Sequence, residues 1–475
     1  MITLTYARNL AEGAGFSLSP GTVHYGFTSP LNVLLLAGVG SLVGFELAIA
    51  TTTVSLILLL LVATRGLSRI VFEDGAPGIA LAIAIAANPL MASTYGLELL
   101  LGAALSVGLL TAWLRRKVKL TGLLLGLLML TRPDYGTVAV LALLLEPDHQ
   151  TLFGLDRARL SSAPRWRTAF KTALWALAPV LLWHGFAWIV LGSGLPVTFL
   201  IKFAQNPWGA FHFLNGPWMY VDRYPLATIG VLLPLMALAA GIPGWRRSAD
   251  AEGPTAASQL AWPALGFAAA HFAGLAILRV PPYHWYYVPS LTFALVAAWC
   301  CLGNRRSRVP RRWLAAVFAF AAVSPLLLSA ATRGVPLEEV PIHTNWATHD
   351  DYREMGRWLR DNLPSDEDIE IQGEIGTLAY YSRLPLADQF SHPAAFPDLL
   401  HKTGHGARTR FGDFKAINFR FHPGAVPLTP RWCLRGRPGN RAVVDAHAGG
   451  AVRTWRFQSS WTSTNWALLP CPPQP

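Results

Sequence analysis

Charged side chains are scarce in this sequence. Lysine, arginine, aspartate and glutamate make up 14% of its 475 residues, whereas hydrophobic residues make up 52% and the mean hydropathy is +0.36. A chain so poor in charge is too apolar for one or two ordinary soluble domains. Several apolar stretches, for example 47–62, 173–191 and 313–331, approach the roughly 20 residues that a helix needs to cross a bilayer. We therefore expect most of the chain to lie in lipid.

Acidic residues are fewer than basic ones, 27 against 39, and the formal net charge is +12. Such an excess alone would suggest a nucleic-acid partner. The basic residues, however, lie in alternate short connections between the apolar stretches, at 65–69, 115–119, 157–171, 246–247 and 305–312. This alternation is typical of the positive-inside rule. The charge therefore indicates membrane topology, and we expect no nucleic-acid partner.

Cysteine is also rare, with four residues. Cys300 and Cys301 lie at the predicted cytoplasmic end of an apolar stretch, where a reducing compartment keeps thiols free. Cys433 and Cys471 both lie in the predicted outer region. We expect them to form a disulfide, the alternative being two unpaired thiols.

Ten apolar stretches are predicted to cross the membrane, starting and ending outside. They lie near residues 46–63, 76–92, 95–114, 118–131, 136–146, 168–192, 224–244, 260–279, 283–302 and 313–332. The fourth and fifth are short, so they either cross the membrane or form a hairpin within it, and Pro133 is expected to end the fourth. The stretch 30–44 is too short for a further crossing and is expected to be a helix at the outer interface.

From about residue 335 the long apolar runs give way to charges and prolines. Asp351 and Glu354 stand at capping-box spacing before a helical pattern, and 369–371 alternates like a strand. We therefore predict an α-helical polytopic membrane protein with a small α/β extracytoplasmic C-terminal domain. Its three parts are an outer first loop with an interfacial helix (1–45), a transmembrane domain (46–334) and the C-terminal domain (335–475).

The N-terminal segment has no signal-peptide pattern, yet the charge rule places it outside. We expect a span that precedes Met1 in a longer chain, or a start codon placed too late.

Short motifs along nearly the whole chain resemble the outer loops and outer domain of multi-span GT-C glycosyltransferases. The motifs are 2–13 with 27–31, 88–89 with 96–98, 131–134, 194–199, 282–287, 352–364 and 373–382. In their order they are similar to actinobacterial-type arabinofuranosyltransferases and related enzymes that use polyprenyl-phosphate sugars. The resemblance implies a GT-C fold, a polyprenyl-phosphate-linked donor and a cell-envelope glycan or lipid acceptor. It also implies transfer on the outer face of the bacterial inner membrane.

Two departures from the family pattern affect the expected chemistry. The family carries an acidic pair, regarded as catalytic, just before the segment that matches Ile2, and here Met1 stands where that motif ends. The chain is therefore expected to be either a clipped enzyme or a non-catalytic relative. Tyr25 is the second departure, because many relatives have an acidic residue before the glycine.

Sugar transfer from a polyprenyl phosphate needs a base for the acceptor hydroxyl and cations, or a divalent metal ion held by carboxylates, for the leaving phosphate. Because the donor's tail stays in the bilayer, the candidates are polar residues of the outer loops. We predict Asp134 and His284 as catalytic residues and a divalent metal as the one cofactor that such chemistry would use. The predicted substrate-binding residues are Arg8, Asn9, Thr28, Glu98, Arg132, Lys202, Tyr283 and Trp285.

Most of these candidates also have a purely structural interpretation. Arg8 is alternatively an interfacial residue paired with Glu12, and Lys202 a solvated loop lysine. Glu98 alternatively complements a helix N-terminus. The remaining alternatives are an Arg132–Asp134 ion pair, an interfacial aromatic belt for 283–287, and helix packing for His184 and His271.

Two other functions compete with glycosyl transfer. One is a lipid or glycan transporter or flippase, although the spans show no inverted repeat and few charges within the membrane. The other is a structural assembly protein, which would need no polar cluster on the outer loops.

Overall fold

The computed structural model describes residues 1–19, 23–145, 163–199, 208–232, 255–301, 311–334, 339–371, 375–388, 418, 430–438 and 450–472. The chain folds into two compact units. The first unit combines Met1–Ile49, Trp183–Gln205 and His343–Pro475. The second unit combines Ala50–Leu182 and Asn206–Ile342.

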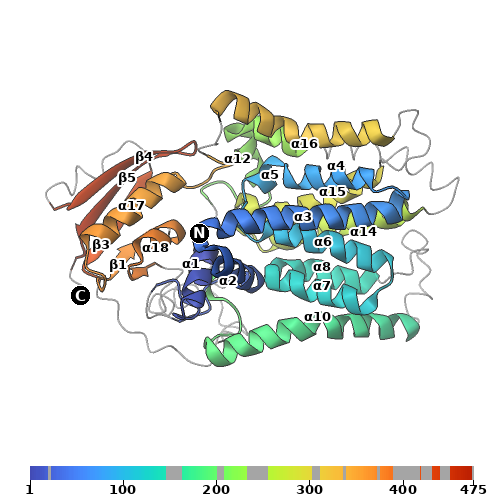
Figure 1. Cartoon of the computed structure of the whole chain (residues 1–475), viewed down its shortest axis with the longest axis horizontal. Helices are drawn as coiled ribbons and strands as arrows, with labels where there is room; N and C mark the ends of the chain where they lie inside the picture. Colours follow the sequence, from blue (N-terminus) through green and yellow to red (C-terminus); the bar gives the residue numbers. More distant parts are fainter. Residues whose placement is uncertain are drawn as a thin grey trace. The chain divides into compact units, whose positions relative to one another are not determined.

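The second unit is built from helices, most of them apolar. They are α3 (Phe45–Phe72, whose first five residues belong to the first unit), α4 (Ala76–Ala86), α5 (Pro89–Ala92), α6 (Leu99–Leu114), α7 (Val118–Thr131), α8 (Gly136–Leu145), α10 (Ala163–Val190, whose last eight residues belong to the first unit), α12 (Gly216–Arg223), α14 (Ala256–Ile277), α15 (Val288–Cys300) and α16 (Arg311–Arg333). Helix α14 packs on α15 and α8, α6 on α7, and α4 on α16 (Figure 1).

Each predicted apolar stretch contains a helix within its described residues, including 225–232 of the seventh stretch. Three described helices are long and apolar enough to span a membrane, at Phe45–Phe72, Trp166–Val190 and Ala256–Ile277. The other described apolar helices have shorter apolar stretches, such as Ala315–Ala331 within α16. Length and composition alone do not show a crossing. The number of ten crossings therefore stays a prediction.

The predicted span 76–92 is two helices. Helix α4 ends at Ala86, and Asn88 begins α5 by accepting a hydrogen bond from the Leu90 amide through its side chain at 3.0 Å. The cause is Pro89, which disfavours helical backbone at the residue before it, while the Asn88 side chain replaces a lost backbone acceptor.

Two glycines one helical turn apart allow α7 to approach α10 closely. A Cβ atom on Gly122 would collide with the backbone oxygen of Thr172, and one on Gly126 with that of Ala176. This is the small-residue spacing that lets apolar helices pack backbone against backbone.

The first unit contains α1 (Ile2–Ala11), α2 (Pro30–Val43), α17 (His349–Asn362), α18 (Gly376–Ser382) and a five-stranded sheet. The strands are β1 (Ile369–Ile371), β2 (Leu386–Ala387), β3 (Trp432–Pro438), β4 (Arg453–Gln458) and β5 (Ser463–Pro470), in the order β2-β1-β3-β5-β4. Strand β1 pairs in parallel with β2 and β3, and β5 pairs antiparallel with β3 and β4.

One hydrophobic core joins the two ends of the chain in this unit. Leu4 and Tyr6 of α1 belong to the same buried cluster as Met355 of α17, Ile369 of β1 and Leu468 of β5. Helix α1 packs on both α2 and α18. The three predicted domain boundaries stay a prediction, because a shared core does not show which segments fold alone.

Helix α17 begins earlier than the sequence suggested. Thr348 is its N-cap: its hydroxyl accepts a hydrogen bond from the Asp351 amide at 3.2 Å, and Asp351 accepts one from the Thr348 amide at 2.9 Å. The capping box predicted at Asp351 and Glu354 is therefore wrong by three residues. The Thr348 hydroxyl, rather than the Asp351 carboxylate, caps the first turn.

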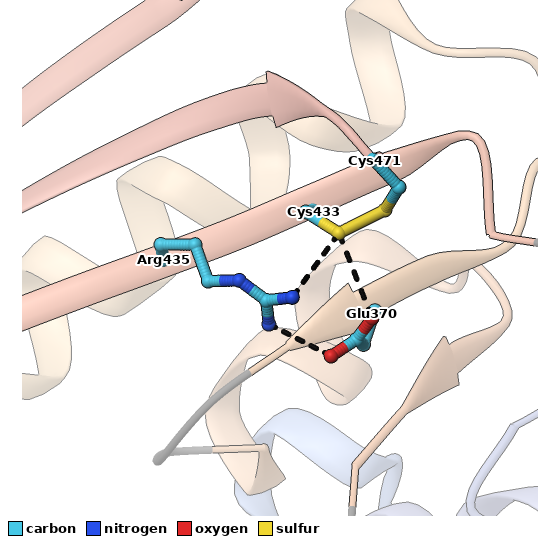
Figure 2. The surroundings of a disulfide bond; sticks show 4 residues. All are labelled: Glu370, Cys433, Arg435 and Cys471. Carbon is cyan, nitrogen blue, oxygen red and sulfur yellow. Dashed lines mark hydrogen bonds and ion pairs between the residues drawn. A yellow bond between two sulfur atoms is a disulfide. The ribbon is translucent and has the colours of Figure 1, made fainter. Parts of the chain in front are cut away.

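The predicted disulfide is confirmed. Cys433 of β3 is bonded to Cys471, directly after β5, with 5.0 Å between their Cα atoms (Figure 2). Arg435 lies beside it, with Nη1 2.8 Å from Glu370 Oε1 and Nη2 3.3 Å from the Cys433 sulfur. Cys300 and Cys301 are free thiols, as predicted.

Candidate functional site

A cluster of buried charges surrounds Arg132 in the second unit. Arg132 follows α7 in extended backbone, with φ −156° and ψ 129°, because the next residue is Pro133. The proline opens a short 3-10 turn, η1 (Pro133–Tyr135), that leads directly into α8. Pro133 therefore ends the helix as predicted. The 3-10 turn that it opens brings the Arg132 and Asp134 side chains together.

The Arg132 guanidinium binds two carboxylates at once. Its Nη1 lies 2.8 Å from Glu98 Oε1, and its Nη2 lies 2.7 Å from Asp134 Oδ2, while Nε reaches both Asp134 oxygens at 3.0 and 3.1 Å. The three side chains are between 7% and 11% exposed. Sequence reasoning proposed the Arg132–Asp134 pair as an alternative and missed the contact with Glu98. Glu98 precedes α6 but its carboxylate caps no backbone amide there.

A histidine and a serine from two further helices extend this cluster. His271 of α14 is fully buried; its Nε2 lies 3.3 Å from Asp134 Oδ2, and its Nδ1 lies 2.8 Å from the Ser290 hydroxyl of α15. In the tautomer that carries its proton on Nε2, the imidazole accepts from Ser290 and presents its N–H to Asp134. His271 was expected to be a packing residue. Its position in an apolar helix was the signal for a polar role, whereas nothing in the sequence indicated Ser290.

An aromatic segment of the second unit contacts the Arg132 cluster through the ring of Tyr286. The ring of Tyr286, in the 3-10 turn η2 (His284–Tyr286), lies 5.1 Å from the Arg132 guanidinium carbon. Tyr283 and Trp285 stack with 4.4 Å between ring centroids. His284 is buried, with its ring at 5.0 Å from Trp285 in an edge-on arrangement. Part of the predicted aromatic motif therefore meets the predicted charged motif through Tyr286.

A second polar group surrounds Arg8 in the first unit. Arg8 Nη1 donates to the backbone oxygen of Tyr380 at 2.7 Å, and the guanidinium carbon lies 4.5 Å from the centre of that residue's ring. The Asn9 side-chain amide donates a hydrogen bond to the backbone oxygen of Ser17 at 2.9 Å. Glu12, the partner expected for Arg8, instead contacts Arg383 at 3.4 Å.

One donor of Arg8 remains unused. Arg8 is 5% exposed, and its Nε is buried without a hydrogen-bond partner. Burial lowers the pKa of the Arg8 guanidinium, and the nearby charge of Arg383 lowers that pKa further. A buried N–H without an acceptor is costly for a protein. An anionic ligand at this atom would remove the cost.

Tyr25 is part of the core rather than of a polar site. It is buried, its hydroxyl accepts a hydrogen bond from Trp183 Nε1 at 2.8 Å, and burial raises the pKa of that hydroxyl. The glycine after it is required by packing, because a Cβ on Gly26 would lie 2.6 Å from His24 Nε2. A carboxylate in place of Tyr25 would be surrounded by aromatic rings.

The predicted site residues fall into separate groups. Glu98, Arg132 and Asp134 form one cluster, Tyr283, His284 and Trp285 lie in the adjoining aromatic segment, and Arg8 and Asn9 lie in the first unit. Thr28 is half-buried in the segment before α2. Lys202 lies outside the described residues.

No protein-family model and no curated protein matches the chain. It is similar to two solved structures of ArnT from Cupriavidus metallidurans, one bound to undecaprenyl phosphate and one in the apo state. Identity is 13% for each, the TM-scores are 0.55 and 0.57, and each comparison covers 98% of this chain and 92% of the other.

At this identity the likeness shows the fold, so the chain has the fold of ArnT, a GT-C glycosyltransferase. The likeness does not distinguish arabinofuranosyltransferase-like enzymes from other GT-C enzymes. That finer resemblance stays a prediction from the sequence.

Proposed function

We propose that this protein is a membrane glycosyltransferase that moves a sugar from a polyprenyl-phosphate donor to a cell-envelope acceptor on the outer face of the bacterial inner membrane. The observation that carries the proposal is the fold likeness over 98% of the chain to ArnT, one structure of which holds undecaprenyl phosphate. The order of the sequence motifs supports the same class of donor. The transferred sugar is a pentose or a hexose.

Arg8 is the residue we propose for the donor phosphate. Among the described arginines, it keeps a buried N–H that no protein group accepts. Arg132, also predicted to bind substrate, already donates from Nε, Nη1 and Nη2 to carboxylates. A phosphate at Arg132 would have to displace one of them. We therefore assign Arg132 and Glu98 the role of holding the helices around the aromatic segment.

Asp134, one of the two predicted catalytic residues, is engaged by neighbouring side chains. A general base must accept a proton from the acceptor hydroxyl. Both oxygens of Asp134 are bound by Arg132, and Oδ2 also contacts His271. We propose His284 as the base because Tyr283 and Trp285 lie beside it as surfaces on which a sugar can stack.

A divalent metal ion was the expected cofactor, and the described acidic residues fit one poorly. Glu98 and Asp134 are both bound by Arg132, which supplies the positive charge in that place. A further group with metal-ligand spacing, Glu370 with Cys433 and Cys471, has its two sulfurs joined in the disulfide. We expect donor binding to survive chelation with EDTA. Loss of binding that Mg²⁺ or Mn²⁺ restores would contradict this.

The test compares undecaprenyl phosphate with undecaprenol. Purified full-length protein in neutral detergent is expected to be stabilised against heat by the phosphate and not by the alcohol. Proteoliposomes that contain a panel of labelled polyprenyl-phosphate pentoses and hexoses then report transfer to envelope extracts. Equal effects of the two lipids would overturn the proposed donor class.

A non-catalytic relative is the second candidate, favoured by the binding of both Glu98 and Asp134 to Arg132. It predicts selective binding of undecaprenyl phosphate without transfer of sugar. A flippase would instead move labelled donor across the proteoliposome membrane without consuming it.

A further inference from the structure

A cavity lies in the second unit at the opposite end of α7 from Arg132. Its volume is about 760 Å³, and residues of α3, α6, α7 and the α6–α7 connection line it. Helix α7 has 14 residues, so its two ends are about 20 Å apart at 1.5 Å per residue. The cavity is therefore distinct from the Arg132 cluster and has no role in the proposed transfer.

The mouth of this cavity is strongly basic. Arg115, Arg116, Lys117 and Lys119 belong to its lining, which contains no carboxylate. All four are exposed, and no described acidic residue forms an ion pair with any of them. Lys119 has an aromatic neighbour instead, with its amine 5.6 Å from the Trp175 ring. Four cations around one opening, none of them paired with an acidic residue in the described part of the chain, favour an anionic ligand.

The rest of the lining is small or apolar. Gly66 of α3 and Gly108 of α6 have no side chains to fill the space. A Cβ on Gly66 would meet nothing within 4 Å, and one on Gly108 would meet the Leu124 methyl groups at 3.7 and 3.9 Å. The cavity thus has a charged opening and an apolar interior between helices, which matches an amphiphile rather than a free anion.

We propose that this cavity binds an anionic phospholipid, with its phosphate at Arg115, Lys117 and Lys119 and an acyl chain beside Gly66 and Gly108. The positive-inside pattern places the opening on the cytoplasmic side, where anionic lipids give the membrane surface its negative potential. Basic pockets between transmembrane helices on that side are a known physical solution for holding such headgroups. The proposal does not depend on glycosyl transfer.

The test measures thermal unfolding of the full-length protein in neutral detergent with added phosphatidylglycerol or phosphatidylcholine. Phosphatidylglycerol is expected to raise the midpoint and phosphatidylcholine to leave it unchanged. Two variants are expected to weaken apparent phosphatidylglycerol binding about tenfold. The triple variant R115Q/K117Q/K119Q removes the charge, and Gly66→Leu fills the interior while all the cations stay.

The matched control is R167Q/K171Q/R312Q, which removes three exposed cations outside the cavity lining. It is expected to bind phosphatidylglycerol like the wild type, and equal weakening in this control would overturn the site. The same shift with inorganic phosphate alone, or a shift with undecaprenyl phosphate but none with phosphatidylglycerol, would overturn the assigned lipid. If the charge-removing triple does not fold, Gly66→Leu decides, because its added Cβ meets no neighbour.

Discussion

Arg132 is the shared cation of two buried carboxylates, and each of them depends on it. With Arg132 removed, Glu98 and Asp134 would remain as two acids in a largely water-free place. Breaking one partner of a buried pair usually costs more than the pair itself contributes, since the remaining charge keeps its desolvation penalty.

Arg132→Gln is therefore expected to destabilise the protein by about 3–5 kcal/mol, measured by thermal or denaturant unfolding in detergent. The matched control is Arg383→Gln, whose pair with Glu12 has side chains 58% and 45% exposed and is expected to change stability by less than about 1 kcal/mol. Equal stability of the two variants would mean that the Arg132 cluster is loosely held and open to substrate.

Arg8→Gln is expected to weaken binding of undecaprenyl phosphate at least about tenfold, since a hydrogen bond to a charged group contributes roughly 1.5–3 kcal/mol. Arg383→Gln, close to Arg8 but exposed, is expected to bind like the wild type. Unchanged binding in Arg8→Gln would remove Arg8 from the donor site and leave it as the support of Tyr380.

The sequence identified the charged residues of the Arg132 cluster but did not predict which residues they contact. Arg132 and Asp134 are two positions apart, so their pair was foreseeable, whereas Glu98 lies 34 positions from Arg132. Ser290 meets His271 across two helices. Such contacts depend on the packing of α6, α14 and α15, which periodicity does not fix.

At the scale of elements, composition predicted the helices well because apolar runs and loops differ strongly in charge. It predicted their ends less well. Helix α3 continues through Arg65 and Arg69 to Phe72, because an arginine is a good helix former even beyond the apolar run. The predicted start of α17 was wrong because Thr348 and Asp351 are both residue types that favour the N-cap position. The hydrogen bonds of the structure show that Thr348 occupies it.

The Gly122 and Gly126 contact makes a testable claim about α7 and α10. Gly122→Ala with Gly126→Ala places two methyl groups against the backbone of α10, so we expect lower thermal stability despite alanine's higher helix propensity. Gly185→Ala on α10, where a Cβ meets nothing within 4 Å, should be neutral or stabilising. Raised stability in the double variant would show that the two helices separate easily.

The disulfide closes a connection of 38 residues between two strand ends that are already paired. A loop of that length corresponds to about 4 kcal/mol in the chain-entropy account. Cys433→Ser with Cys471→Ser is expected to make the C-terminal region more sensitive to limited proteolysis. Cys301→Ser, which removes a free thiol, should leave the digestion pattern unchanged. Alkylation after denaturation should label two thiols without reductant and four with it.

At the scale of the whole molecule, the order of the sequence motifs predicted the GT-C fold. The predicted arrangement of membrane crossings rests on the distribution of the basic residues. A cysteine at Ser365 is predicted to react with a membrane-impermeant maleimide in intact cells, and one at Lys117 only after lysis. Both residues are exposed, and the variants are made with Cys300 and Cys301 replaced by serine. The opposite labelling pattern would reverse the predicted topology.

The Arg132 cluster also has a consequence for biogenesis. Glu98 leaves the ribosome 34 residues before Arg132, and His271 follows Asp134 by 137 residues. At a synthesis rate of about 5–20 residues per second, Glu98 waits roughly 2–7 s for its cation, and Asp134 roughly 7–27 s for the imidazole. During this delay the early helices cannot enter lipid with their final partners. The Glu98–Arg132 pair can therefore form only after α7 has been made, and the order of translation becomes part of how the protein assembles.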